Sequence, residues 1–135
     1  MGQQRTILID DMHRRVPRDA VAASPSPARW LIEPMDGGPA LVAPPGCRAP
    51  DLVLSQGAEG SHEVYIGLCS LDGQSSEVEV RMGPDGPFRR LRWEGGEIGY
   101  REVSLGIVEM RGKEIVLRHP AGGRSCVSHV RLVPR

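Results

Sequence analysis

The chain has 135 residues, with 17 Lys plus Arg balanced by 17 Asp plus Glu. This length suits one ordinary domain, and we expect residues 1–135 to share one core. Zero formal net charge gives no overall field toward nucleic acid or an anionic bilayer, so we expect neither as a partner. Aromatic residues make up only 4%, while 17 Gly and 12 Pro predict many turns and no long helices.

The N-terminal third contains three short strand candidates around a loop. "TILID" reads as a first short strand. Residues 13–29, "HRRVPRDAVAASPSPAR", have no sustained apolar face, so we predict a loop with one helical turn after Pro17. "RWLIEP" and "PALVAPP" follow as apolar runs closed by proline, which is confined to strand ends, edges and bulges.

From Pro50 onward, runs of alternating residues recur between turns. In "HEVYIGLCSL", one face carries Val64, Ile66 and Leu68, and the other carries Tyr65 and Cys69. "SEVEVRM" sets Val78, Val80 and Met82 against Glu77, Glu79 and Arg81, the pattern of a strand with one solvated face. "GPDGP" then predicts a tight turn before "FRRLRW".

Three more runs complete the chain. "YREVSLGIVEM" directs Val103, Leu105 and Ile107 to one side, and after the turn "RGK" the run "EIVLRH" directs Ile115 and Leu117 inward. The final strand is expected to carry Cys126, Ser128, Val130 and Leu132 on one face and Val127, His129, Arg131 and Val133 on the other.

These short strands predict an all-β fold, an antiparallel two-sheet sandwich of jelly-roll-like type with eight to ten strands. A single sheet would leave one apolar face in water, and runs such as "GIVEM" carry too many apolar residues for that.

The cysteines Cys47, Cys69 and Cys126 are odd in number and lack a Cys-x-x-Cys spacing. This argues against a disulfide framework and a structural zinc site, and we expect Cys69 and Cys126 to be inert core residues. His129 lies three positions after Cys126, so the two should point to opposite strand faces and form no metal or thiol site. With no signal-like or membrane-length apolar stretch, we expect a cytoplasmic chain. No phosphate loop, dinucleotide fingerprint or His-Glu-x-x-His motif is present, so we expect no cofactor.

The order of the motifs resembles the galactose-binding-like and golvesin-like β-sandwich modules that accompany bacterial polysaccharide-active proteins. The similarity runs from "APDLVL" and "GSHEVYIGL" through "VEVRM", "FRRL" and "EVSLGIVEMRGKEIVLRHP" to "SHVRLVP". It implies an accessory sandwich fold, and its motifs are structural rather than catalytic. The chain departs from the pattern at Ser128, where Asp is frequent, and at His62 and His129, where aromatic residues are frequent.

The candidate ligand-binding residues are Trp30, Trp93 and Tyr100, because sugar rings present apolar C–H faces that stack on aromatic rings. The candidate polar partners are Arg90, Arg92 and Glu97, which lie near Trp93 and Tyr100 within the stretch "FRRLRWEGGEIGY". The alternative is that both tryptophans fill the core.

Other chemistry is weakly signalled. The aromatic residues of "FRRLRW" could stack on the bases of a single-stranded nucleic acid while its arginines contact the phosphates. The adjacent glutamates instead favour a solvated strand face. The carboxylate pairs Asp10 with Asp11 and Glu94 with Glu97 do not predict a hydrolytic cleft. Asp36, Asp51 and Asp72 match no calcium-ligand spacing and are expected to stabilise turns.

The sequence therefore predicts a non-catalytic module that binds a polysaccharide or oligosaccharide. The alternative is a structural interaction module that packs on a catalytic domain or on another copy of itself. Sugar binding predicts a solvent-facing aromatic residue beside polar groups in a groove. An interaction module predicts a flatter apolar patch and buried tryptophans.

Overall fold

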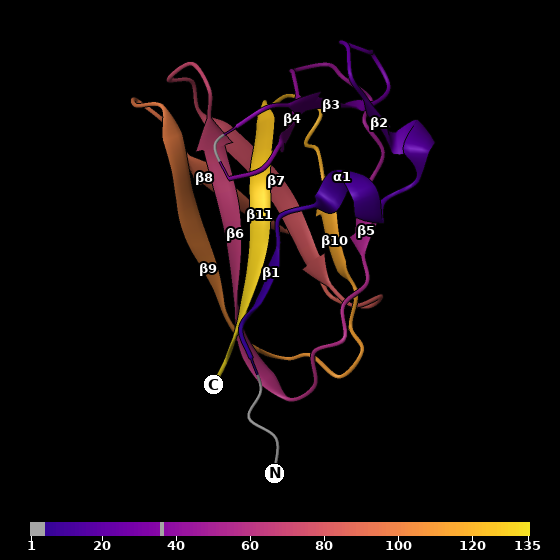
Figure 1. Ribbon diagram of the computed structural model, residues 1–135, viewed down its shortest axis with the longest axis vertical. Helices are drawn as coiled ribbons and strands as arrows, with labels where there is room; N and C mark the ends of the chain where they lie inside the picture. The colour runs from indigo at the N-terminus through magenta and orange to yellow at the C-terminus, as the bar shows by residue number, and fades with distance from the viewer. Residues whose placement is uncertain (1–4, 36) are drawn as a thin grey trace.

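The computed structural model describes residues 5–35 and 37–135, and two β-sheets face each other in it (Figure 1). The larger sheet contains, in spatial order, β2 (Val21–Ala22), β3 (Trp30–Glu33), β4 (Ala40–Ala43), β11 (Ser125–Pro134), β6 (Ser61–Ser70) and β9 (Gly99–Glu109), and β1 (Ile7–Ile9) also pairs with β11. The smaller contains β5 (Leu52–Leu54), β10 (Ile115–Arg118), β7 (Ser76–Met82) and β8 (Arg89–Trp93). The predicted two-sheet, all-β sandwich is confirmed.

Strand pairing is antiparallel throughout the described sheets except between β2 and β3. Strand β11 lies in the middle of the larger sheet, with β6 along one edge and first β4, then β1, along the other. The last strand of the chain therefore completes the centre of that sheet. The described residues form eleven strands rather than eight to ten, because pieces as short as β2 leave no alternation to recognise.

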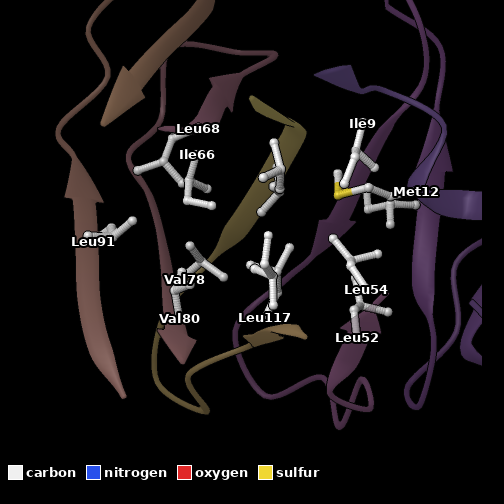
Figure 2. Close-up of a cluster of buried hydrophobic side chains, with 14 of the residues drawn as sticks. Ile9, Met12, Leu52, Leu54, Ile66, Leu68, Val78, Val80, Leu91 and Leu117 are labelled. Atoms are coloured by element: carbon white, nitrogen blue, oxygen red, sulfur yellow. The ribbon is translucent and has the colours of Figure 1, made fainter. Parts of the chain in front are cut away.

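The core lies between the sheets, as the alternating strands predicted. Figure 2 shows Ile66 and Leu68 of β6 facing Val78 and Val80 of β7. The predicted inward residues of β10, Ile115 and Leu117, are completely buried. Burying apolar side chains of this size contributes about 1.5–3 kcal/mol each, so this layer is the main source of stability.

A bulge in β11 corrects the predicted faces of that strand. The pairing with β6 shifts register between Val127 and His129. Val127 therefore shares the buried core face with Val130 and Leu132, whereas Cys126 belongs to a separate cluster on the outer face of the sheet. An extra residue in one strand reverses the alternation beyond it, and the sequence pattern alone does not reveal the position of the bulge.

A second irregularity corrects the prediction for Ile107. The pairing between β6 and β9 shifts register between Glu63 and Tyr65, opposite the stretch that contains Gly106 at φ 86°. Leu105 stays buried, but Ile107 lies on the outer face with 64% of its surface exposed. The expectation that Ile107 shares a face with Leu105 was wrong for the same geometric reason.

The segment predicted as a loop, residues 13–29, contains more structure than expected. It begins inside α1 (Met12–Arg15), and the turn predicted after Pro17 is the 3₁₀ helix Arg18–Ala20, which precedes β2. Met12 is buried and, in Figure 2, lies beside Ile9 above Leu54. No helix in the described ranges is long and apolar enough to cross a membrane.

The cysteine prediction was wrong, because Cys69 and Cys126 form a disulfide between β6 and β11, with their Cα atoms 5.1 Å apart. The two residues come into register because these strands are antiparallel neighbours, which cysteine counting cannot reveal. The bulge also places Cys126 and His129 on the same outer face, but the disulfide consumes the thiol. Cys47 is buried, with its Sγ 3.5 Å from the carbonyl oxygen of Ser26.

Candidate functional site

The outer face of the larger sheet carries a hollow of about 320 Å³. Its floor is formed by outward side chains of β9 and β11, namely Tyr100, Glu102, Ser128, His129 and Arg131. Its wall is formed by Leu8, Asp10, Met35, Gly37 and Gly38. The β11 bulge builds this floor, because it turns Ser128 and His129 outward together.

Gly67 makes room for the centre of the hollow. It lies on β6 between His129 of β11 and Glu102 of β9, in register with both. A Cβ atom at this position would collide with the His129 ring. Because glycine leaves that space open, His129 Nε2 reaches across β6 to Glu102 Oε2 at 2.9 Å. Ser128 Oγ lies 2.8 Å from His129 Nδ1 and completes the contacts of the imidazole ring.

Arg131 fixes the Glu102 carboxylate from the other side. Its Nε and Nη2 each donate to a different carboxylate oxygen at 2.8 Å, and its guanidinium lies 4.3 Å from the centre of the Tyr65 ring. These hydrogen bonds hold the pKa of Glu102 below its usual range and raise the pKa of Arg131. Glu102 is therefore an ionised, preoriented acceptor whose charge is balanced by a neighbour.

Tyr100 supplies an open aromatic surface at the edge of this cluster. Its side chain is 60% exposed, and its ring meets His129 edge-on, with ring centres 5.2 Å apart. A second, more open hollow of about 600 Å³ shares Tyr100 and Met35 with the first and includes the exposed Ile98. Tyr100 can thus stack on a flat apolar surface while Glu102 and Arg131 provide hydrogen-bonding groups nearby.

The structure excludes both tryptophans as exposed stacking platforms. Trp30 is 0% exposed, and its Nε1 donates to the carbonyl oxygen of Pro50 at 2.8 Å. Trp93 is 7% exposed and belongs to the core. The alternative interpretation, that the tryptophans fill the interior, describes their positions. Of the three predicted aromatic candidates, only Tyr100 lies in the hollow.

The predicted polar partners do not line either hollow beside Tyr100. Arg90 and Arg92 lie on the smaller sheet, where Arg90 faces Glu79 at 3.8 Å and Arg92 faces Glu77 at 3.6 Å. Glu97 is exposed in the turn between β8 and β9. These residues are near Tyr100 in sequence, but the turn sends the two strands into different sheets.

Sequence reasoning missed Glu102, His129 and Arg131. The available signal was the outward set of "YREVS" combined with that of "SHVRL". Joining them required knowing that β9 and β11 both flank β6. It also required the bulge, without which Ser128 would be assigned to the opposite face.

Comparisons with known proteins bear on the fold. No protein-family model matches this sequence, and no curated protein matches it significantly. Among solved structures, the CBM36-1 domain of a multidomain xylanase from the hindgut metagenome of Trinervitermes trinervoides is 12% identical, with a TM-score of 0.58, and the match covers 97% of this chain and 98% of that one. A carbohydrate-binding module CBM36 in complex with calcium and xylotriose is 17% identical, with a TM-score of 0.54 and coverage of 96% and 99%.

This chain has the β-sandwich fold of these carbohydrate-binding modules. A third neighbour, an exo-β-1,3-galactanase from Phanerochaete chrysosporium with β-1,3-galactotriose, is 16% identical with a TM-score of 0.52. The match covers 71% of this chain and only 23% of that enzyme. At such identities the likeness concerns the fold, and it carries over no residue of any neighbour's site.

The xylotriose complex contains calcium, an ion that proteins bind through carboxylate and carbonyl oxygens. No cluster of three or more His, Cys, Asp or Glu side chains suited to a metal occurs in residues 5–35 and 37–135. Asp51 is held by Arg118 at 3.2 Å. Asp72 accepts from the backbone nitrogen of Gln74 at 3.1 Å, which is the turn role predicted for it. Asp36 lies outside the described residues.

Proposed function

We propose that this chain is a non-catalytic carbohydrate-binding module whose ligand lies in the hollow beside Tyr100. The observation that carries the proposal is an exposed tyrosine ring next to the oriented Glu102 and Arg131 pair within one hollow. A sugar ring offers an apolar C–H face to the tyrosine and hydroxyl groups to the charged pair. The fold shared with carbohydrate-binding modules supports this proposal.

The state of Glu102 favours binding over catalysis. Glycoside hydrolysis requires one carboxylic acid that can give up a proton, and therefore one raised pKa. Hydrogen bonds from Arg131 lower the pKa of Glu102 instead. We accordingly propose an accessory role in a polysaccharide-active protein, in keeping with the galactose-binding-like and golvesin-like resemblance of the sequence.

A second candidate function is docking to a catalytic domain or to another copy of the chain. The exposed apolar side chains around Tyr100 favour it, since Ile98 is 74% exposed and Leu8 is 50% exposed. The buried tryptophans were also expected for such a module. A protein interface and a sugar site would both use Tyr100. The two functions are therefore distinguished by whether a glycan or a protein binds there.

The test is a titration of the purified protein with neutral soluble polysaccharides, followed by calorimetry. We expect at least one glycan to bind the wild type and the Tyr100→Ala variant to lose about tenfold or more in affinity. The matched control is Ile107→Ala, which removes an exposed side chain from the same strand outside the hollow. This control should bind as the wild type does.

Solution behaviour separates the second candidate. One result would replace the sugar-binding proposal with the docking function: no glycan binds, the wild type self-associates, and Tyr100→Ala abolishes that self-association. Acrylamide quenching provides an independent check on the geometry. Because Trp30 and Trp93 are buried, their fluorescence should be weakly quenched, and a bound glycan should change it little.

A further inference from the structure

One row of paired residues crosses five strands of the larger sheet. Pairing places Leu31 of β3 opposite Val42 of β4, and Val42 opposite Cys126 of β11. The disulfide links Cys126 to Cys69 of β6, and Cys69 lies opposite Tyr100 of β9. Four steps of about 4.8 Å between neighbouring strands make this row about 19 Å long. It runs across the strands on the outer face.

Three hollows follow this row and share side chains where they meet. The hollow that contains Glu102 and the open hollow have Tyr100 and Met35 in common. The open hollow and a third one, of about 380 Å³, have Leu71 in common. Met35 and Leu71 pack on the disulfide cluster, and both line the open hollow between the other two. The three hollows therefore follow one another along a path across the strands from β9 to β3, which is the neighbour of the edge strand β2.

The third hollow has its own oriented polar group. Arg124 Nη1 lies 2.9 Å from Asp72 Oδ2 and 2.7 Å from Gln74 Oε1. Both contacts use the same nitrogen, and no acceptor in the described residues contacts Nε or Nη2. Leu31 and Val42 form an apolar floor beside this arginine, and Glu33 adds an acceptor. Such a combination of donor, acceptor and apolar surface repeats the chemistry of the hollow at Tyr100.

The charges along the path favour an uncharged ligand. Asp10 and Glu102 line the first hollow with Arg131, and Glu33 and Asp72 line the third with Arg29 and Arg124. Carboxylates on the path therefore at least equal the guanidinium groups. An acidic polymer would meet these carboxylates without a surplus of positive charge to offset the repulsion.

We infer that the ligand is a linear, uncharged glycan that lies across the strands, with a second subsite at Arg124. This inference rests on the proposed function and deepens it, because it specifies a chain of several sugar residues rather than a single sugar or a chain end. The disulfide, which joins β6 to β11 in the row between the two subsites, keeps them at a fixed separation.

The experiment is calorimetry with neutral β-1,4-linked oligosaccharides from two to six residues, namely the xylose, glucose and mannose series. Affinity should increase about tenfold or more from the shortest to the longest member of the series that binds. Arg124→Ala should remove most of this gain and leave the disaccharide affinity unchanged. Glu33→Gln leaves the contacts of Arg124 with Asp72 and Gln74 in place. It should nevertheless reduce the increase in affinity with chain length, because Glu33 lines the same hollow. Arg118→Ala, which breaks the comparable pair with Asp51 on the other sheet, is the control and should change nothing.

The outcomes separate the two proposals. Equal affinities for short and long oligosaccharides, with binding still dependent on Tyr100, would overturn the second subsite and leave the proposed function intact. Tighter binding of polygalacturonate or a sulfated glycan than of any neutral chain would overturn the inference of an uncharged ligand. Absence of binding to every glycan would overturn the proposed function and this inference with it.

Discussion

The outer faces of the two sheets both carry paired charged residues, but they differ in shape. On the smaller sheet, arginines of β8 face glutamates of β7, with Arg90 and Glu79 directly in register. The Phe88 ring contacts both Arg81 and Arg118, whose guanidinium carbons are 4.8 Å and 3.7 Å from the ring centre. On the larger sheet, Gly67 and a bulge open a hollow with a polar floor beside the apolar cluster around the disulfide. Alternation of residues therefore gives a solvated face, and local irregularity turns such a face into a site.

Among the changes that distinguish the two sheets, removing the disulfide of the larger sheet should reduce stability the most. The bond closes a segment with a sequence separation of 57, so the Cys69→Ala and Cys126→Ala double variant should lose about 2–5 kcal/mol of unfolding free energy. Urea denaturation of the oxidised protein and the variant measures the difference.

Thiol counting provides the control for that experiment. The unfolded, unreduced protein should react with one equivalent of alkylating reagent, at Cys47. Three reactive thiols would contradict the disulfide. Because such bonds persist in oxidising surroundings, the same count on protein extracted from cells also tests the cytoplasmic prediction.

Filling the space at Gly67 should damage one face only. The added methyl group of Gly67→Ala would push the His129 ring away from Glu102, at a cost of about 1–3 kcal/mol in stability. Glycan affinity should also decrease, and Arg90 and Arg92 should keep their amide resonances. Gly57→Ala is the matched control, since nothing lies within 4 Å of a Cβ atom there. Unchanged affinity in Gly67→Ala would show that the His129 contact does not shape the site.

Lowering the pH should weaken the same cluster. The pKa of Glu102 in the folded state lies below the ordinary value of 4.5, chiefly because Arg131 donates hydrogen bonds to it. The resulting stabilisation is present above pH 4.5 and is lost as the pH decreases through the folded-state pKa. Glu102→Gln should be less stable than the wild type at neutral pH, and the difference should narrow in acid. Urea titrations at several pH values test this, and a constant difference would contradict it.

The charge pairs of the smaller sheet should matter least. Arg90 and Arg92 are about half exposed, and ion pairs at such positions contribute little to stability because solvent screens them. Arg90→Ala and Arg92→Ala should therefore change thermal stability little and glycan affinity not at all. A loss of glycan affinity in either variant would contradict the proposed site and support the binding role first predicted for Arg90 and Arg92 from sequence.

The sequence allowed the sandwich and most inward residues to be predicted, because alternation survives wherever the strands are regular. It failed at Val127 and Ile107, where bulges reverse the alternation. It also failed at Cys69 and Cys126, because strand order decides which cysteines meet. Tyr100 could be proposed for the site from its aromatic residue type, but Glu102 and Arg131 could not. Their meeting depends on β6 lying between two strands that are far apart in the chain.

The most direct test of the central claim is a two-dimensional amide NMR titration with the glycan that binds best. The account predicts that the resonances that move belong to the outer face of the larger sheet, led by Tyr100, Glu102 and Arg131. Resonances of Arg90, Arg92 and Arg118 on the smaller sheet should stay in place. The opposite distribution of shifts, or shifts confined to the turn at Glu97, would contradict the proposed site.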